Sequence, residues 1–284
     1  MKGKTCIITG ATGGIGLEAA ARLGVLGARL MIVGRSRDKG EAALAQLRAR
    51  VPSVAVEMHY ADLSRSDDIV RLARDLLGTA PRIDVLLNNA GAFFARRAIT
   101  PDGLERTFAL NHMGYFRLTA LLRPRLIESA PARVINIASD AHRGARLDFD
   151  DLQCSKGYSG WKAYRRSKLA NILFTRVLAR RLQGTGVTAN CLHPGFVATG
   201  FGDNNPGVWR IMIGIAKRIS AIPVQSGAET PVYVACSSEL AGTTGKYFEK
   251  WREQEPDPAA QDDEAATQLW KESERLAGFE LPSF

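Results

Sequence analysis

Thr5-Cys6-Ile7-Ile8-Thr9-Gly10-Ala11-Thr12-Gly13-Gly14-Ile15-Gly16 gives the clearest indication of architecture in this chain. An apolar strand-like run, Thr5–Thr9, passes directly into a glycine-rich turn, and a helical pattern begins there. Glycine lets the backbone turn tightly and approach a ligand, and the free N–H groups at a helix start attract a pyrophosphate. This strand–turn–helix context predicts a dinucleotide-binding unit. Its expected nucleotide contacts are Gly10, Thr12, Gly14, Ile15 and Gly16.

Short β-branched runs alternate with longer helical patterns along the rest of the chain, as expected for βαβ units. The pattern predicts a single α/β domain over residues 1–284, with a doubly wound parallel sheet of about seven strands. The expected strands are Thr5–Thr9, Arg29–Val33, Val54–Met58, Asp84–Asn88, Arg133–Ile137, Thr188–Leu192 and Lys246–Phe248. Two long helical patterns cover Trp161–Gln183 and Pro258–Leu276.

Composition limits the class of protein. The 284 residues are 45% hydrophobic and 24% charged, enough for one large core. Four scattered cysteines without Cys/His ligand spacing predict a reducing compartment and no metal. No signal-peptide pattern precedes the first strand, so we expect a cytoplasmic protein. The net charge of +9 raises the question of nucleic acid, but the arginines are spread among acids, which favours a solvated basic surface.

Residues 195–223 form a long irregular stretch, which is typical of a substrate-binding loop. This stretch contains apolar residues that are expected either to cover a substrate as a lid or to pack against the domain or a second subunit. They are Val208, Trp209, Ile211, Ile213 and Ile215. Peripheral contact with a membrane surface and a homodimer are further possibilities.

Arginines replace the usual carboxylate at the end of the second strand. Many dinucleotide sites hold the adenosine ribose there with Asp or Glu, whereas this chain has Arg35 and Arg37. Forked, charge-assisted contacts to a ribose 2′-phosphate favour NADP over NAD. One of the two arginines is expected to be simply solvent-exposed, and Asp38 is expected to cap the next helix.

Two further strand ends supply small and polar residues. Asp62-Leu63 follows the third strand and is expected beside the adenine ring, while Asn89-Ala90-Gly91 follows Asn88 at the end of the fourth. Asn88 is consistent with a place beside the cofactor and with a structural role as a hydrogen-bonding residue, and both can hold.

Tyr164 and Lys168 are four residues apart on a predicted helix and therefore share one face. A nearby ammonium lowers the pKa of a phenol, so the pair can act as an acid–base catalyst, although such pairs are also common on helix surfaces. Ser139 follows a strand of the neighbouring unit, and its hydroxyl can donate to a carbonyl oxygen; serines here are otherwise turn residues.

Taken together, these motifs resemble the short-chain dehydrogenase/reductase family over essentially the whole chain. The matching residues, in the expected order, are Thr9-Gly10-x3-Gly14-x-Gly16, Asn88-Asn89-Ala90-Gly91, Asn111, Ser139, Tyr164-x3-Lys168 and Pro194-Gly195. The retinol dehydrogenase-like branch is similar at Gly157–Trp161, Ser167–Asn171, Leu192–Gly195 and Gly245–Phe248.

The resemblance implies a Rossmann sheet, NADP(H) and apolar alcohols or aldehydes such as retinoids. It assigns Tyr164 as general acid/base, Lys168 as the cation that lowers its pKa and binds the nicotinamide ribose, Ser139 as the carbonyl donor and Asn111 as the holder of a relay water. Further expected nucleotide contacts are Pro194, Gly195, Val197 and Thr199. Candidate substrate contacts, with structural roles as the alternative, are Phe93, Asp140, His142, Phe196 and Trp209.

Two other functions compete with this one. A reductase similar to protochlorophyllide reductase shares the Tyr-x3-Lys core, but no cysteine is clearly placed for that chemistry. A dinucleotide-sensing scaffold on the same fold would have no need of an acid–base group.

Overall fold

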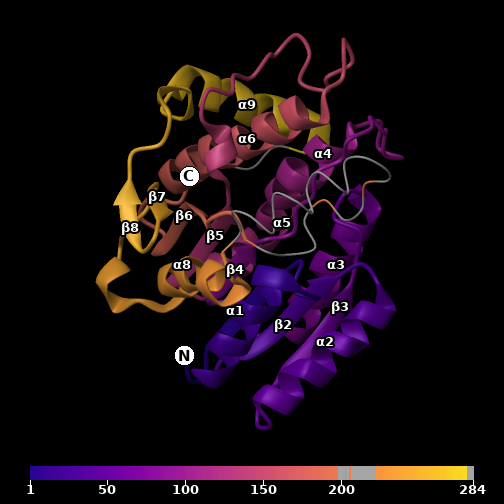
Figure 1. Ribbon diagram of the computed structural model, residues 1–284. Coiled ribbons are helices and arrows are strands. Elements are labelled where there is room, and N and C mark those ends of the chain that lie inside the picture. Colours follow the sequence, from indigo (N-terminus) through magenta and orange to yellow (C-terminus); the bar gives the residue numbers. More distant parts are fainter. Residues whose placement is uncertain (198–201, 203–204, 206–221, 280–284) are drawn as a thin grey trace.

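The computed structural model describes residues 1–197, 202, 205 and 222–279, and these form one sheet with helices on both faces (Figure 1). The described strands follow the order β3-β2-β1-β4-β5-β6-β7-β8. Neighbours from β3 to β7 are parallel, and β8 pairs antiparallel with β7. The strands are β1 Thr5–Thr9, β2 Arg29–Gly34, β3 Val56–Tyr60, β4 Val85–Asn88, β5 Ala132–Ile137, β6 Val187–His193, β7 Tyr247–Glu249 and β8 Arg252–Gln254.

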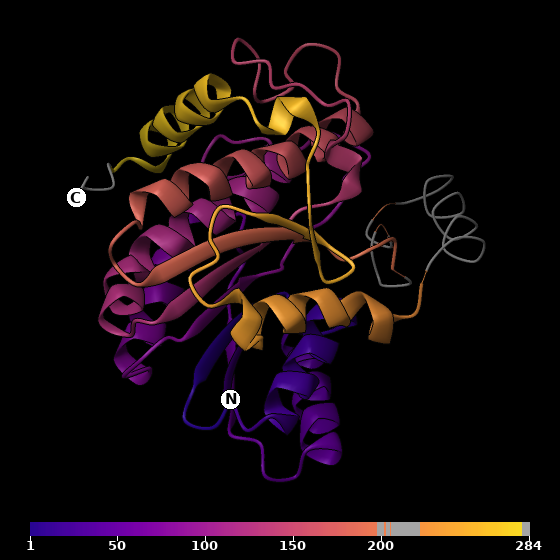
Figure 2. The same ribbon diagram turned by 90° about the vertical axis from the view of Figure 1, so that its left-hand side faces the viewer.

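Burial on both faces explains why the central strands read as continuous apolar runs. Successive side chains of a strand point to opposite faces. Ile7 of β1 accordingly packs in the layer with α3, α5, α6 and α9, whereas Cys6 and Ile8 pack in the layer with α1, α2 and α8. Figure 2 shows α9 lying over α6 on one side of the sheet and α8 on the other.

The helices fill the crossovers between parallel strands. Asn111 lies in a short π-helix, η1, that continues directly into α5. The helices are α1 Gly14–Val25, α2 Arg37–Arg50, α3 Ser66–Thr79, α4 Arg106–Phe108, η1 Ala109–Met113, α5 Gly114–Glu128, α6 Gly160–Arg181, α8 Val224–Cys236 and α9 Asp263–Ala277. Single 3-10 turns are η2 Asp140–His142, η3 Ser238–Leu240 and η4 Pro258–Ala260. No helix in the described residues is long and apolar enough to cross a membrane.

The predicted α/β fold class is confirmed, and several elements differ in detail, most of them by one or two residues at their ends. β3 begins at Val56, two residues later than predicted. β8 is an additional antiparallel strand, so the described sheet has eight strands. The helix predicted from Pro258 is interrupted: the side chain of Asp257 caps a 3-10 turn, and Asp262 then caps α9 by accepting from the N–H of Ala265.

The strand order reverses beside β1, which pairs with β2 on one side and β4 on the other. In open parallel sheets ligands bind beyond the carboxyl ends of the strands at such a reversal. The predicted site residues at those ends are Gly10 after β1, Arg35 after β2, Asn89 after β4, Ser139 after β5 and Pro194 after β6.

Candidate active site

Asn89 fixes the glycine-rich turn in place. Its Nδ2 donates to the carbonyl oxygens of Thr9 at 2.8 Å and Gly10 at 3.2 Å. Gly10 has φ +66°, and a Cβ there would lie 2.8 Å from Ala90 Cα; a Cβ on Gly16 would lie 2.6 Å from Asn89 Nδ2. Only glycine fits at both positions, so the turn is held tightly against the end of β4 at the start of α1.

Arg35 and Asp62 meet across the ends of β2 and β3. Arg35 Nη1 lies 3.6 Å from Asp62 Oδ2, with the arginine side chain 61% exposed. Asp62 Oδ1 accepts from the N–H and hydroxyl of Ser64. The Arg37 guanidinium lies 4.9 Å from the Tyr60 ring centroid. Two cationic groups therefore border the edge where the sequence predicts the adenosine end of a nucleotide.

Ser139 and Tyr164 come together from β5 and α6. Ser139 Oγ accepts from the N–H of Ala141 at 3.2 Å, and its side chain is close enough to Tyr164 to lower the pKa of the phenol. The Tyr164 ring is 8% exposed and meets Phe93 edge-on, with ring centroids 6.4 Å apart. The phenol thus reaches the serine hydroxyl while its ring is packed from behind.

Lys168 follows Tyr164 by about one turn of α6, and the side chains of Lys168 and Asn111 both lie near Gly91. Lys168 Nζ donates to the carbonyl of Ile137 at 2.9 Å, and Asn111 Nδ2 donates to Ala92 O and Ser167 Oγ, each at 3.0 Å. A Cβ on Gly91 would lie 3.3 Å from Asn111 Oδ1 and 3.4 Å from Lys168 Nζ. The structure therefore brings the predicted acid–base residues and the end of β4 to one place. Short π-helical segments such as the one holding Asn111 are frequent at functional sites.

The expected lowering of the Tyr164 pKa is wrong for this arrangement. Burial raises the pKa of Tyr164 to about 12, against a smaller lowering by the hydrogen bond to Ser139. Burial likewise lowers the pKa of Lys168 to about 7. The ammonium lies 5.8 Å from the phenol ring centroid and donates to Ile137. Desolvation therefore outweighs the pairing, and Tyr164 is protonated at neutral pH.

His142 does not take the predicted place as a substrate contact. It is fully buried, its Nδ1 lies 2.7 Å from Ser139 O, and its Nε2 accepts from the N–H of Asp257. Both ring nitrogens are used within the protein, so His142 supports the turn after Ser139. Asp140 beside it forms an ion pair with Arg143.

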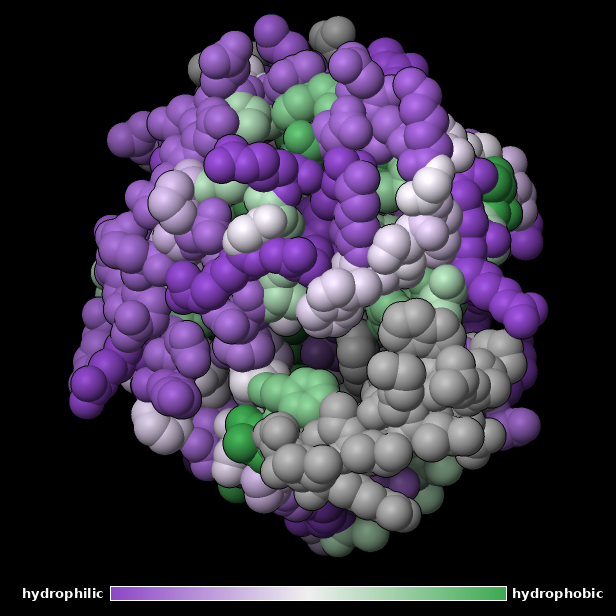
Figure 3. Space-filling model, turned by 45° about the horizontal axis from the view of Figure 1, so that its top comes forward, coloured by the Kyte–Doolittle hydropathy of each residue, from purple (hydrophilic) through white to green (hydrophobic). Residues whose placement is uncertain are grey.

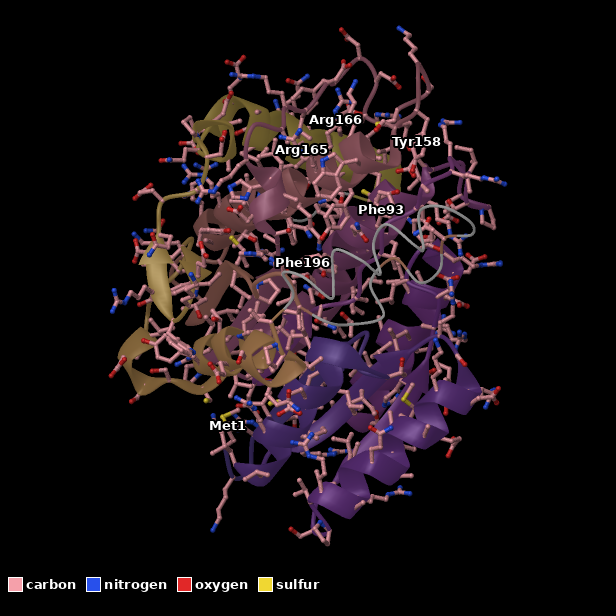
Figure 4. The ribbon with its side chains drawn as sticks, in the orientation of Figure 1. Met1, Phe93, Tyr158, Arg165, Arg166 and Phe196 are labelled. Carbon is pink, nitrogen blue, oxygen red and sulfur yellow. The ribbon has the colours of Figure 1, made fainter. Side chains whose placement is uncertain are left out.

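The Phe93 ring contacts Tyr164. Its side chain is only 2% exposed, so it is closed to solvent. Phe196 is 40% exposed after β6, next to Pro194, Gly195 and Val197. Thr199, Trp209 and most of 195–223, including the predicted apolar lid, lie outside the described residues. Figure 4 shows the side chains of Phe93 and Phe196 in the middle of the molecule.

Residues 4–206 match the short chain dehydrogenase family. The chain belongs to the short-chain dehydrogenase/reductase family. It is thus an oxidoreductase that acts on CH–OH groups, and its similarity to three relatives below assigns it to the retinol dehydrogenase-like branch.

Human retinol dehydrogenase 13 is 39% identical to this chain, and the match covers 99% of this chain and 86% of the relative. Human retinol dehydrogenase 14 is 40% identical over 98% and 87%, and mouse retinol dehydrogenase 12 is 41% identical over 98% and 87%. A crystal structure of an uncharacterized protein from Mycobacterium paratuberculosis has a TM-score of 0.79 at 32% identity, over 99% of this chain and 96% of that one. Actinorhodin polyketide ketoreductase with NADPH has a TM-score of 0.66 at 25% identity, over 86% and 94%.

Sequence reasoning missed the role of the two arginines inside the short-chain dehydrogenase motif Tyr164-x3-Lys168. Arg165 donates to the carbonyl oxygens of Ala141 and Arg143. Arg166 is buried and donates to the carbonyl oxygens of Arg146 and Asp151, with further contacts to Asp148 and Cys154. Both therefore fasten the loop after Ser139 to α6 (Figure 4). Spacing gave no signal for this, because adjacent helix residues point to different partners.

Proposed function

We propose that the protein is an NADP(H)-dependent oxidoreductase that interconverts an apolar alcohol and its aldehyde or ketone, with Tyr164 as general acid/base. The observation that supports this most strongly is that the Ser139 side chain approaches Tyr164, while Lys168 and Asn111 are held by hydrogen bonds to Ile137 O and Ser167 Oγ nearby. A serine hydroxyl and a protonated phenol converging on one point can both donate to a carbonyl oxygen.

The glycine turn fits a nucleotide, because the close packing of Gly10 and Gly16 leaves the backbone N–H groups at the start of α1 as the natural phosphate ligands. A bound nicotinamide nucleotide supplies the hydride of this chemistry. Arg35 and Arg37 would hold the ribose 2′-phosphate, and Asp62 the adenine amino group. Asn89, Ala90, Gly91 and the residues after β6 would line the nicotinamide end.

The chain's own residues handle the proton. In carbonyl reduction Tyr164 Oη gives its proton to the oxygen that becomes negative, and Ser139 Oγ stabilises the same oxygen by a hydrogen bond. Lys168 then favours the phenolate left behind, and Asn111 orders the path by which Tyr164 is reprotonated. Because the buried phenol is protonated at neutral pH, the site is ready for reduction.

The substrate proposal rests on apolar groups and on relatives. Phe196 and Ile222 are exposed beside the strand ends, and residues 195–223 are proposed as the substrate-binding segment. The relatives' names point to retinoids as the first compounds to test. The cytoplasmic location, the homodimer and the membrane contact stay predictions.

The test is NADPH oxidation by the purified protein with retinal, long-chain aldehydes, a steroid ketone and a quinone. The proposal expects turnover of at least one apolar aldehyde or ketone. NADPH binding without oxidation of any compound would instead support the dinucleotide-sensing scaffold. Turnover of the quinone alone would support a reductase of another class. Reduction by NADH in preference to NADPH would remove the roles given to Arg35 and Arg37.

A further inference from the structure

Trp161 lies directly beside the Tyr164 ring. It is the second residue of α6, three before Tyr164, so both side chains share one helix face. The two rings stack, with centroids 5.8 Å apart and planes inclined by 21°. The Trp161 side chain is nevertheless 48% exposed, among the most exposed large apolar groups of the described residues. Part of its apolar surface covers the phenol, and the rest meets solvent.

Tyr164 is already supported on another side. Phe93 meets the same ring edge-on at an interplanar angle of 81° and is itself 2% exposed. A fully buried aromatic ring thus packs behind the phenol. Support of the Tyr164 ring therefore does not explain why Trp161 keeps an exposed apolar surface.

Further apolar groups are exposed at the neighbouring strand end. Phe196 and Ile222 are 40% and 37% exposed, and the Ile222 N–H donates to Phe196 O at 2.7 Å. Phe196 follows β6, which is the neighbour of β5, and β5 leads to Ser139; Ile222 lies beside Phe196 just before α8. Figure 3 shows hydrophobic side chains at the edge of a hollow on one face of the molecule. Clustered exposed apolar surface of this kind marks ligand sites.

We propose that Trp161 is a specificity-determining residue that stacks on a flat, conjugated or aromatic group attached to the reacting carbonyl. This inference rests on the proposed function and names the shape of its substrate. A carbonyl oxygen bound to Ser139 and Tyr164 places the adjoining carbons beside the indole, since the indole and the phenol are in contact. A planar apolar group gains stacking and burial there, whereas a short alkyl chain does not reach across the indole.

The experiment compares three aldehydes with NADPH: cinnamaldehyde, 3-phenylpropanal and butanal. Cinnamaldehyde is flat, 3-phenylpropanal has the same ring on a bent saturated chain, and butanal has no ring. Trp161→Ala should lower kcat/KM for cinnamaldehyde about tenfold, the order of one lost aromatic contact. The loss should be smaller for 3-phenylpropanal and below twofold for butanal. Trp161→Phe should restore most of the cinnamaldehyde activity.

Trp251 is a matched control, because it is 49% exposed and lies on the turn between β7 and β8 at the sheet edge. Trp251→Ala should leave all three aldehydes within twofold of wild type. Thermal unfolding and NADPH affinity are measured for each variant, and Trp161→Phe provides the test if Trp161→Ala does not fold.

Equal losses of kcat/KM for all three aldehydes in Trp161→Ala would overturn the inference. They would mean that Trp161 only packs against Tyr164. Wild-type protein that binds NADPH but reduces no aldehyde or ketone would instead overturn the proposed function, and the inference with it. The two failures are distinguishable because the second is seen in wild type before any variant is compared.

Discussion

Tyr164 shows how burial and pairing compete at a single residue. The spacing to Lys168 predicts a lowered pKa, but removal of both groups from water favours their neutral forms. The neutral phenol is the form that donates a proton to a carbonyl oxygen. The role proposed for Tyr164 is therefore that of a neutral phenol that donates a proton, and not that of a resting phenolate.

Titration of the protein by absorbance near 295 nm tests this state. Phenolate absorbs there, so the difference between wild type and Tyr164→Phe reports Tyr164 alone. Because its pKa is about 12, the difference should show no ionisation step below about pH 10. A step between pH 6 and 9 would show that Lys168 dominates after all.

Arg35 and Arg37 determine cofactor choice in this account. Arg35 is exposed beside Asp62, and each charge-assisted contact to a phosphate contributes about 1.5–3 kcal/mol. Arg35→Ala should therefore raise KM for NADPH roughly 10–100-fold and change KM for NADH little. Arg48→Ala is the control, because Arg48 is exposed in the last turn of α2, whereas Arg37 begins that helix. Equal effects on both nucleotides would contradict a 2′-phosphate contact.

At the scale of elements, α6 provides two of the proposed catalytic side chains, Tyr164 and Lys168, and the anchors of the loop after Ser139. Arg166 is 9% exposed and donates to two backbone carbonyls of that loop. Its loss would leave these part-buried acceptors without their partner. Helix and loop thus form one unit, which explains how Ser139 and Tyr164 stay aligned although 25 positions separate them along the chain.

Arg166→Met should lower the free energy of unfolding by about 2–4 kcal/mol, measured by urea denaturation. Arg166→Lys should recover only part of this, since one ammonium cannot reproduce the forked contacts. Arg180→Met is the matched control on the same helix: Arg180 is about half exposed and pairs with Asp263, so its loss should cost at most about 1 kcal/mol. Similar losses for Arg166→Met and Arg180→Met would mean that the loop is held by other contacts.

At the scale of the molecule, a buried histidine joins the site to the C-terminal helix. His112 follows Asn111 in η1, its Nε2 lies 2.8 Å from Ser273 Oγ of α9, and Phe108 and Phe174 surround its ring. Burial lowers the pKa of His112 to about 3. The helix α9 is therefore part of the support of Asn111 and not a separate addition.

This burial predicts an acid-sensitive fold. The unfolded chain binds a proton at His112 near pH 6.5, but the folded chain does so only near pH 3. The contribution of His112 to stability is complete above about pH 6.5 and is lost as pH falls, by at most about 1.4 kcal/mol per pH unit. His112→Phe should show a shallower loss of unfolding free energy between pH 6.5 and 4. An unchanged slope would contradict the buried neutral state.

The sequence predicted the layers and the positions of several candidate site residues, because local patterns determine these positions. Two-sided burial of β1 and the glycine turn are visible as an apolar run followed by glycines, and Tyr164 and Lys168 share a helix face by spacing alone. It could not predict His142 as a buried support or Arg166 as a loop anchor. Those roles depend on which distant backbone atoms arrive beside them, and no spacing within the chain encodes that.

Tyr164→Phe, measured for NADPH affinity and for aldehyde reduction in one preparation, tests the central claim most directly. The substitution removes one hydroxyl and keeps the ring that packs against Phe93 and Trp161. The account predicts NADPH affinity within about twofold of wild type and a fall in kcat of roughly 10²–10⁴-fold. Retained turnover with retained NADPH binding would contradict the assignment of Tyr164 as the proton donor.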